Sequence, residues 1–136
     1  MNEAVRLERL EEALDLLRQG AAGAAVVVEG PRDRAALEAL GVGGTHIVVN
    51  QGRGLEVLID QTVEATRQAG WPRVILMMDW DRTGARLQRR LEEGFAGRIP
   101  VEVQLRARLR RVSHTTSFEE VPFDLAGLRR RVGGRP

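Results

Sequence analysis

Three short apolar runs stand out along the chain, and each of them ends at a polar residue. Runs this short and this rich in β-branched side chains are typical of strands buried on both faces of a parallel sheet. We therefore predict strands at residues 24–29, 46–50 and 74–78. A fourth strand is predicted to begin at Val101, where apolar and polar residues alternate.

Between these runs, apolar residues recur every three or four positions, which is the spacing of one helix face. Leucines at this spacing predict a helix over residues 3–19. Further helices are predicted at residues 31–40, from residue 55, from Thr83, and from Pro122 to Val132. The alternation of helices and strands predicts an α/β fold with a sheet of about four parallel strands, joined by right-handed crossovers.

Carboxylates follow two of the predicted strands. Glu29 closes the first strand and Asp79 follows the third, with Asp81 two residues farther along. Ligands of open α/β sheets bind beyond the carboxyl ends of the strands. Clustered carboxylates repel one another, and Mg²⁺, which prefers oxygen ligands, removes that repulsion. The sequence thus predicts a magnesium site at this edge, with Mn²⁺ as an alternative ion.

Two short motifs contain these acids. Residues 29–33 read Glu-Gly-Pro-Arg-Asp and resemble the E-G-x-x-D element of Toprim domains, and residues 79–84 read Asp-Trp-Asp-Arg-Thr-Gly and resemble their D-x-D element. Toprim domains occur in topoisomerases, bacterial-type primases, OLD-family nucleases, ribosomal-RNA maturase ribonucleases and recombination mediators. The resemblance implies a Toprim domain with a Rossmann-like parallel sheet, flanked by helices, at residues 24–112. An N-terminal helix and linker (1–23) would precede it, and a C-terminal helical extension with a mobile basic tail (113–136) would follow.

The Toprim resemblance also bears on an ambiguous stretch. Residues 101–112 alternate apolar and polar side chains, as a half-buried strand does, but Leu105, Leu109 and Val112 also fit one face of a helix. The resemblance favours a short strand that turns into a helix near Leu105. A polar loop is expected to follow at residues 113–118.

The D-x-D element is expected to hold the metal. Alternate residues of an extended chain point the same way, so Asp79 and Asp81 would aim two carboxylates at one point. An alternative role for Asp81 is to cap the helix that follows, and it can do both. The nearby Glu29 motif favours metal binding. Gly30 and Gly84 would permit a close approach of the backbone.

Glu29 and Asp33 are the catalytic candidates. The resemblance implies that Glu29 is an acid–base group or a further metal ligand, whereas the alternative is an ion pair with Arg32 or Arg53. Asp33 lies in the first turn of a predicted helix, where the helix dipole already favours a negative charge. Capping and a site role are therefore similarly compatible with the pattern, and the resemblance favours support of the site.

Arginines are the expected phosphate ligands. Arg82 and Arg86 form one basic face on the helix that begins at the D-x-D element, and we expect them to bind phosphate. Pro31 departs from the Lys or Arg often found within the first Toprim element. Arg32 is therefore expected to supply that cation, and without it the activity would be weak or absent.

Charge is divided unevenly along the chain. Residues 1–97 carry 12 Arg and 15 acidic residues, a net charge of −3, whereas residues 98–136 carry 9 Arg and 4 acidic residues, a net charge of +5. This division suits a polyanionic substrate held near a metal site. The arginine runs at 106–111 and 129–131 are expected to be mainly solvated, because charge runs usually are. Few aromatic residues accompany them, which argues against a base-stacking platform.

Composition excludes several functions. The 136 residues fit a single domain and include no Cys and no Tyr. Disulfides and Cys-ligated zinc are therefore excluded, and so is the tyrosyl-DNA link of a topoisomerase. The sequence has no apolar run long enough to span a bilayer and no signal-peptide pattern, so we expect a cytoplasmic protein without a membrane partner.

Together these features favour Mg²⁺-dependent phosphodiester chemistry, most simply hydrolysis, on RNA or DNA. One alternative is a non-catalytic nucleic-acid-binding or assembly module. A second is a small-molecule phosphate binder on a flavodoxin-like sheet. The sequence leaves the choice between RNA and DNA open, together with the question of a homodimer or a protein partner.

Overall fold

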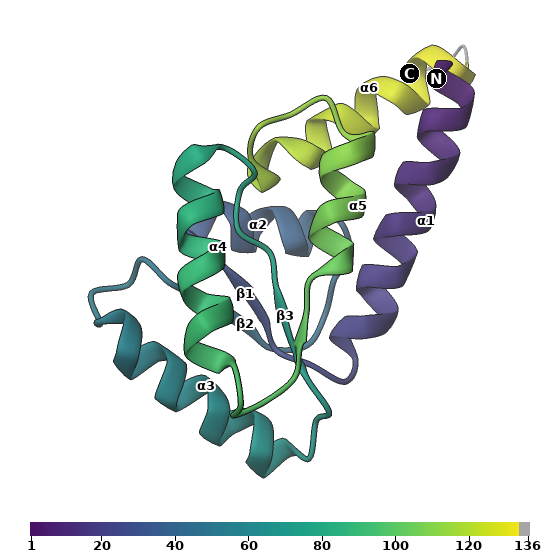
Figure 1. Ribbon diagram of the computed structural model, residues 1–136. Helices are drawn as coiled ribbons and strands as arrows, with labels where there is room; N and C mark the ends of the chain where they lie inside the picture. Colours follow the sequence, from purple (N-terminus) through teal and green to yellow (C-terminus); the bar gives the residue numbers. More distant parts are fainter. Residues whose placement is uncertain (134–136) are drawn as a thin grey trace.

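The computed structural model describes residues 1–133, in which helices cover both faces of a small sheet (Figure 1). In chain order the elements are α1 (Glu3–Ala21), β1 (Val26–Val28), α2 (Pro31–Ala39), β2 (His46–Val48), α3 (Leu55–Ala69), β3 (Val74–Leu76), α4 (Arg82–Phe95), β4 (Val101–Glu102), α5 (Gln104–Val112), η1 (Phe118–Glu120) and α6 (Val121–Gly133). The tail predicted to be mobile lies, apart from Gly133, outside the described residues. Within residues 1–133, no helix combines the length and the apolarity needed to cross a bilayer.

Four parallel strands form the sheet, in the order β2-β1-β3-β4. Val26 of β1 lies opposite His46 on one side and opposite Ile75 on the other. The predicted α/β class and the four-stranded parallel sheet are therefore confirmed. The order makes β1 and β3 neighbours, so the chain segments that follow them leave the same edge of the sheet.

Strand residues alternate between two apolar layers. Val26 and Val28 pack into a core with α1, α2, α5 and α6, whereas Ala25 and Val27 pack with α3 and α4 on the opposite face. All four side chains are fully buried. Because both faces of the sheet are covered, its central strands are continuously apolar and show no alternation with polar residues.

Helix α1 packs against α5 and α6, which lie far from it in sequence (Figure 1). The contact includes a buried cation, because Arg6 is only 3% exposed. Its guanidinium donates to the carbonyl of Val112 at 3.0 Å and forms an ion pair with Asp124 at 2.7 Å. The predicted N-terminal helix and C-terminal extension are thus parts of one packed layer.

The strands are shorter than predicted, but their hydrogen bonding continues past the last paired residues. The N–H of Asn50 donates to the carbonyl of Glu29 at 2.9 Å, and the N–H of Met77 donates to that of Val27 at 2.9 Å. Both predicted strand ends, Glu29 and Asn50, therefore lie in the ladder. Residues 101–112 form the expected short strand followed by a helix, which begins at Gln104.

Candidate functional site

The fold brings four of the predicted acids to one edge of the sheet. Glu29 follows β1 and Asp79 lies just beyond β3, its parallel neighbour. Asp81 is the N-cap of α4, and Asp33 lies in the first turn of α2. The negative charges of Asp33, Glu29 and Asp81 all act on Asp79. We refer to these four carboxylates as the acidic cluster.

Each carboxylate of the acidic cluster is oriented by a backbone N–H. Glu29 Oε1 accepts from the N–H of Asp79 at 3.0 Å, and Asp79 Oδ1 accepts from the N–H of Phe118 at 2.7 Å. Asp81 Oδ1 accepts from Gly84 at 2.7 Å, and Asp33 Oδ2 accepts from Gly30 at 2.9 Å. Among the described residues, no hydrogen-bond donor contacts Glu29 Oε2 or Asp79 Oδ2, so both oxygens can take a ligand.

These bonds also answer the question of capping. Asp81 does cap α4, as the alternative interpretation proposed, and Asp33 belongs to a capping box that closes the start of α2. Capping occupies only one carboxylate oxygen of Asp81. A structural role and a role in ligand binding are therefore compatible for that residue.

Electrostatics within the acidic cluster favour a bound proton or cation. The pKa of Asp79 is raised to about 7, chiefly by burial and also by the charges of Asp33, Glu29 and Asp81, while the hydrogen bond from Phe118 opposes the rise. Burial is also the main cause that raises the pKa values of Glu29 and Asp33. A divalent cation would compete with the proton at Asp79 and relieve the same repulsion.

The acidic cluster is not a preformed cage for a metal ion. Within residues 1–133, no three Asp, Glu, His or Cys side chains converge on a common point at ligand distance. The predicted set of Glu29, Asp79 and Asp81 is spread because each side chain is directed at a backbone N–H. Mg²⁺ commonly takes one or two protein carboxylates and keeps several waters, so the donors present fit a hydrated ion.

The two predicted glycines differ. A Cβ atom on Gly84 would lie 2.0 Å from the carbonyl oxygen of Asp79, so the first turn of α4 packs directly on the backbone that follows β3. A Cβ on Gly30 would meet only Asp33 Oδ2, at 3.9 Å, which is ordinary contact. Close backbone approach therefore holds at Gly84, and the structure does not require it at Gly30.

A surface hollow of about 380 Å³ opens beside the acidic cluster. Its lining includes Glu29, Asp33, Asp79 and the predicted phosphate ligand Arg32. The other lining residues are Gly30, Pro31, Asn50 and Glu119, of which the last two were not predicted as site residues. Asn50 lines the hollow because β2 pairs with β1, and Glu119 lines it because η1 packs against α2.

Arg106 is the main site residue that the sequence did not identify. Its Nε donates to the carbonyl of Met78 and its Nη2 to that of Asp79, both at 2.8 Å. Burial is the main cause that lowers its pKa, and the charge of Arg110 adds to that effect. Arg106 thus links α5 to the backbone that carries the D-x-D element, although it was expected in a solvated basic zone.

The other arginines divide into ion-paired and unpaired groups. Arg82 and Arg86 are exposed and make no ion pair within the described residues, which leaves them accessible to phosphate. Arg129 pairs with Glu11 at 2.9 Å, and Arg131 pairs with Glu3 at 3.0 Å. These last two are solvated surface pairs, as expected for a charge run.

Glu29 forms no ion pair with Arg32 or Arg53 in the described part of the chain. Arg53 donates instead to the side chain of Gln61 at 2.9 Å and to the carbonyl of Val48 at 3.3 Å. The ion-pair alternative for Glu29 is therefore wrong.

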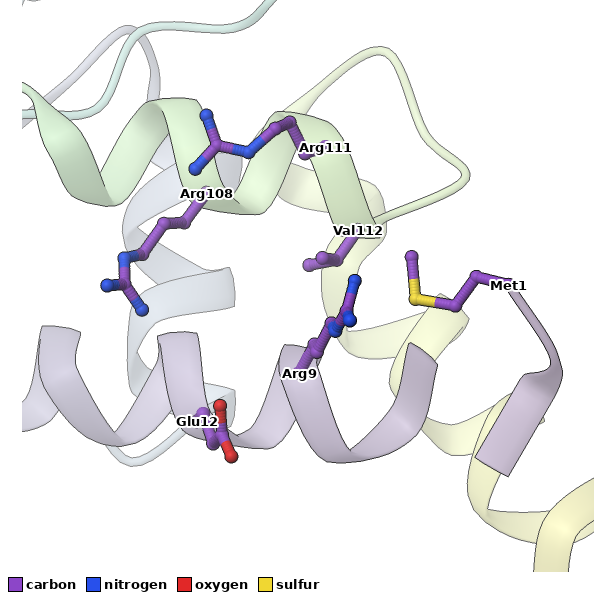
Figure 2. A pocket seen from close by; sticks show the side chains of 6 residues that line it. All are labelled: Met1, Arg9, Glu12, Arg108, Arg111 and Val112. Carbon is purple, nitrogen blue, oxygen red and sulfur yellow. The ribbon is translucent and has the colours of Figure 1, made fainter. Parts of the chain in front are cut away.

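A second hollow, of about 510 Å³, lies away from the acidic cluster, between α1 and α5 (Figure 2). We refer to it as the α1–α5 groove. Its polar lining consists of Arg9, Glu12, Arg108 and Arg111, and it contains no member of the acidic cluster. The larger of these two hollows is therefore basic, and the carboxylates line the smaller one.

Comparisons with known proteins identify relatives among archaea. A UPF0292 protein of Methanosarcina acetivorans is 34% identical over 110 residues, which covers 79% of this chain and 72% of that protein. A UPF0292 protein of Methanocaldococcus jannaschii is 34% identical over 100 residues, which covers 73% of this chain and 74% of that protein. No protein-family model matches the chain.

A solved structure of a protein from Aquifex aeolicus has a similar fold, with a TM-score of 0.67. The alignment covers 81% of this chain and 95% of that one, at 23% identity. At that identity the similarity concerns the fold alone.

Proposed function

This chain belongs to the UPF0292 protein family, and we propose that it is a Mg²⁺-dependent enzyme that hydrolyses phosphodiester bonds of RNA or DNA through a Toprim-like site. The protein would act in the cytoplasm. RNA and DNA share the phosphodiester group, so the proposal names that group and leaves the sugar open.

One contact carries the proposal, namely the hydrogen bond that joins the two motifs. Glu29 and Asp79 are 50 positions apart in sequence, yet Glu29 Oε1 lies 3.0 Å from the backbone nitrogen of Asp79. Motifs that were recognised separately thus share one edge of the sheet, where ligands of open α/β folds bind. Each half-motif alone is a weak signal, whereas their contact supports a single site.

Asp79 and Asp81 would hold the metal ion, directly or through water. Both residues lie in the segment between β3 and α4, and each keeps one carboxylate oxygen that accepts no hydrogen bond from residues 1–133. Mg²⁺ bound there would neutralise charge that develops on phosphate oxygens. Arg32, Arg82 and Arg86 would hold neighbouring phosphates as charged hydrogen-bond donors.

Glu29 would transfer the proton. Its Oε2 contacts no donor among the described residues and is available to accept a proton from an attacking water. Asp33 would support this arrangement, because its carboxylate holds the N–H of Gly30, the residue next to Glu29. Glu29 therefore has a fixed orientation without losing its second oxygen.

A second candidate function is a non-catalytic nucleic-acid-binding or assembly module of the same fold. Two observations favour it: Pro31 stands where a cation is common in the Toprim element, and no three ligands converge within residues 1–133. In that case the acidic cluster would bind a cation, or would be completed by a protein partner or a second copy of the chain.

End-labelled RNA and DNA test the proposal, each in single-stranded and duplex form. Purified protein is incubated with each substrate in Mg²⁺, Mn²⁺ or EDTA, beside Asp79→Asn as a matched control. We expect cleavage with either metal, none in EDTA, and at least 100-fold less with Asp79→Asn. Binding without cleavage of any substrate in either metal would favour the binding module instead.

A further inference from the structure

The α1–α5 groove contains a concentration of positive charge that the acidic site does not use. Figure 2 shows Arg9 projecting from α1 and Arg108 from α5 into the space between the two helices. Arg111 also lines the groove, and Glu12 is the one acidic residue in its lining. Three arginines and a single acidic residue therefore line this hollow of about 510 Å³.

These guanidinium groups have no protein partners in the described part of the chain. Arg9, Arg108 and Arg111 form no ion pair or side-chain hydrogen bond there, and even Glu12 pairs with none of them. Acids are available on the same helix, because Glu3 and Glu11 of α1 pair with arginines of α6. Positive charge on the α5 side of α1 is thus left uncompensated, and a bound anion would relieve it.

Helix α5 connects this groove to the acidic cluster. Arg108 and Arg111 of α5 line the groove, whereas Arg106 reaches the carbonyls of Met78 and Asp79. Arg110 is exposed and close enough to Arg106 for the two charges to interact. Arginines therefore occur on both sides of α5, from the groove to the edge of the sheet that carries the acids.

We propose that the α1–α5 groove binds the phosphodiester backbone of a nucleic-acid strand, which passes over α5 toward the acidic cluster. Guanidinium groups suit this ligand, because they stay charged and present paired N–H donors to phosphate oxygens. The positive charge alone specifies a polyanion. Its identification as nucleic acid rests on the proposed function.

Binding of a labelled oligonucleotide tests this site separately from catalysis. The probe is a fluorescein-labelled 20-nucleotide single strand, as RNA and as DNA, measured by anisotropy in EDTA over a range of salt concentrations. The test variant carries Arg9→Gln, Arg108→Gln and Arg111→Gln. The matched control carries Arg129→Gln, Arg130→Gln and Arg131→Gln, which removes the same charge from α6. Circular dichroism verifies that both variants are folded.

The slope of log K against log salt concentration should be shallower by about 2 in the groove variant. Each of the three lost phosphate contacts with a single strand contributes roughly 0.7 to this slope. Affinity at 50 mM salt should fall on the order of 100-fold, while the control keeps nearly the wild-type slope. A groove variant with the wild-type slope would overturn the proposed site and leave the proposed enzyme intact.

The remaining outcomes separate the two proposals. If the groove arginines are needed for binding but the protein cleaves no substrate in Mg²⁺ or Mn²⁺, the proposed groove site is supported and the proposed enzymatic activity is contradicted. A wild-type protein that binds neither oligonucleotide overturns the proposed groove site, and the proposed enzyme is then decided by the cleavage test with metal. Groove-dependent binding to phosphatidylserine vesicles, with no oligonucleotide binding, overturns the assignment to nucleic acid and identifies a membrane surface as the polyanion.

Discussion

Glu29 accepts a hydrogen bond of 3.0 Å from the backbone N–H of Asp79, across two neighbouring strands. The position of the Glu29 carboxylate is therefore set by the main chain just after β3, whereas the Asp79 side chain is set by the N–H of Phe118. Neither carboxylate holds the other, so either side chain can be replaced without removing the hydrogen bond that the other accepts. Amide substitutions keep these acceptor oxygens and remove only charge and basicity.

Glu29→Gln is expected to slow metal-dependent cleavage by roughly 10²–10⁴-fold, the usual contribution of a general acid or base. The glutamine oxygen still accepts from Asp79, and one negative charge leaves a repelling cluster. The melting temperature should therefore stay the same or rise slightly. Initial cleavage rates and differential scanning fluorimetry measure the two effects.

Glu119→Gln is the matched control for Glu29, because Glu119 lines the same hollow and belongs to neither motif. It should retain most of the activity. Full cleavage by Glu29→Gln would remove the catalytic role of that residue.

Asp79→Asn combined with Asp81→Asn is expected to abolish Mn²⁺ binding. Asparagine remains an N-cap at position 81 and can still accept from Phe118 at position 79, so the fold should survive. Isothermal titration calorimetry measures the affinity. Glu38→Gln with Glu93→Gln removes two exposed acids elsewhere and should bind Mn²⁺ as the wild type does. Equal affinity of the Asp79, Asp81 variant and the wild type would contradict the metal assignment.

The metal-free protein should lose stability as the pH rises from 5 to 8. The folded-state pKa of Asp79 is raised from 3.8 to about 7, chiefly by burial. Between those values the folded protein holds a proton that the unfolded chain has released. The stabilising contribution is complete below the unfolded pKa and is lost as the pH rises through about 7. Melting temperatures in EDTA should fall by roughly a few degrees over this range.

Asp79→Asn should flatten that pH dependence, and added Mg²⁺ should stabilise the wild type more at pH 8 than at pH 5, because the metal competes with the proton. Asp124 does not interfere. Burial raises the pKa of Asp124, but hydrogen bonds from Arg6 and His114 outweigh this effect and hold its pKa below the usual value. Asp124 therefore affects stability only at lower pH. A melting temperature that rises from pH 5 to 8 in EDTA would contradict the assignment.

Arg6→Met is expected to lower the free energy of unfolding by about 3 kcal/mol, because it leaves the carboxylate of Asp124 largely buried without its cation. Urea denaturation measures the loss. Combining it with Asp124→Leu should recover much of the stability, since both charges are then gone. Arg98→Met breaks an exposed pair with Asp60 and should cost less than about 1 kcal/mol. Equal losses for the two arginine variants would show that burial of the Arg6 pair is unimportant.

The sheet could be predicted from the sequence because its signals are local. Continuous apolar runs identified β1 and β3 as strands covered on both faces. The acids directly after them predict a ligand-binding edge, and that function stays a prediction. The strand boundaries were less well predicted. Residues such as Ala24 and Met78 are buried without belonging to the paired part of a strand, so apolarity extends beyond pairing.

Arg106 and Glu119 could not be assigned to the site from sequence, because their positions depend on how α5 and η1 pack against the rest of the chain. Alternation over residues 101–112 supported a strand as well as a helix. The structure has a helix from Gln104, and Arg106 on this helix donates to the carbonyl of Asp79. Capping by Asp81 had a local signal, a carboxylate at the start of a helical pattern, and it was anticipated as an alternative.

The packing of α1 against α5 and α6 has a consequence during synthesis. Leu10, Leu14 and Leu17 of α1 are fully buried, and part of their cover comes from helices that begin at Gln104 and Val121. Until those residues leave the ribosome, the apolar face of the first helix lacks its final neighbours. Docking of α1 is therefore a late event in vectorial folding, and a nascent chain stalled before α5 would present this face to chaperones.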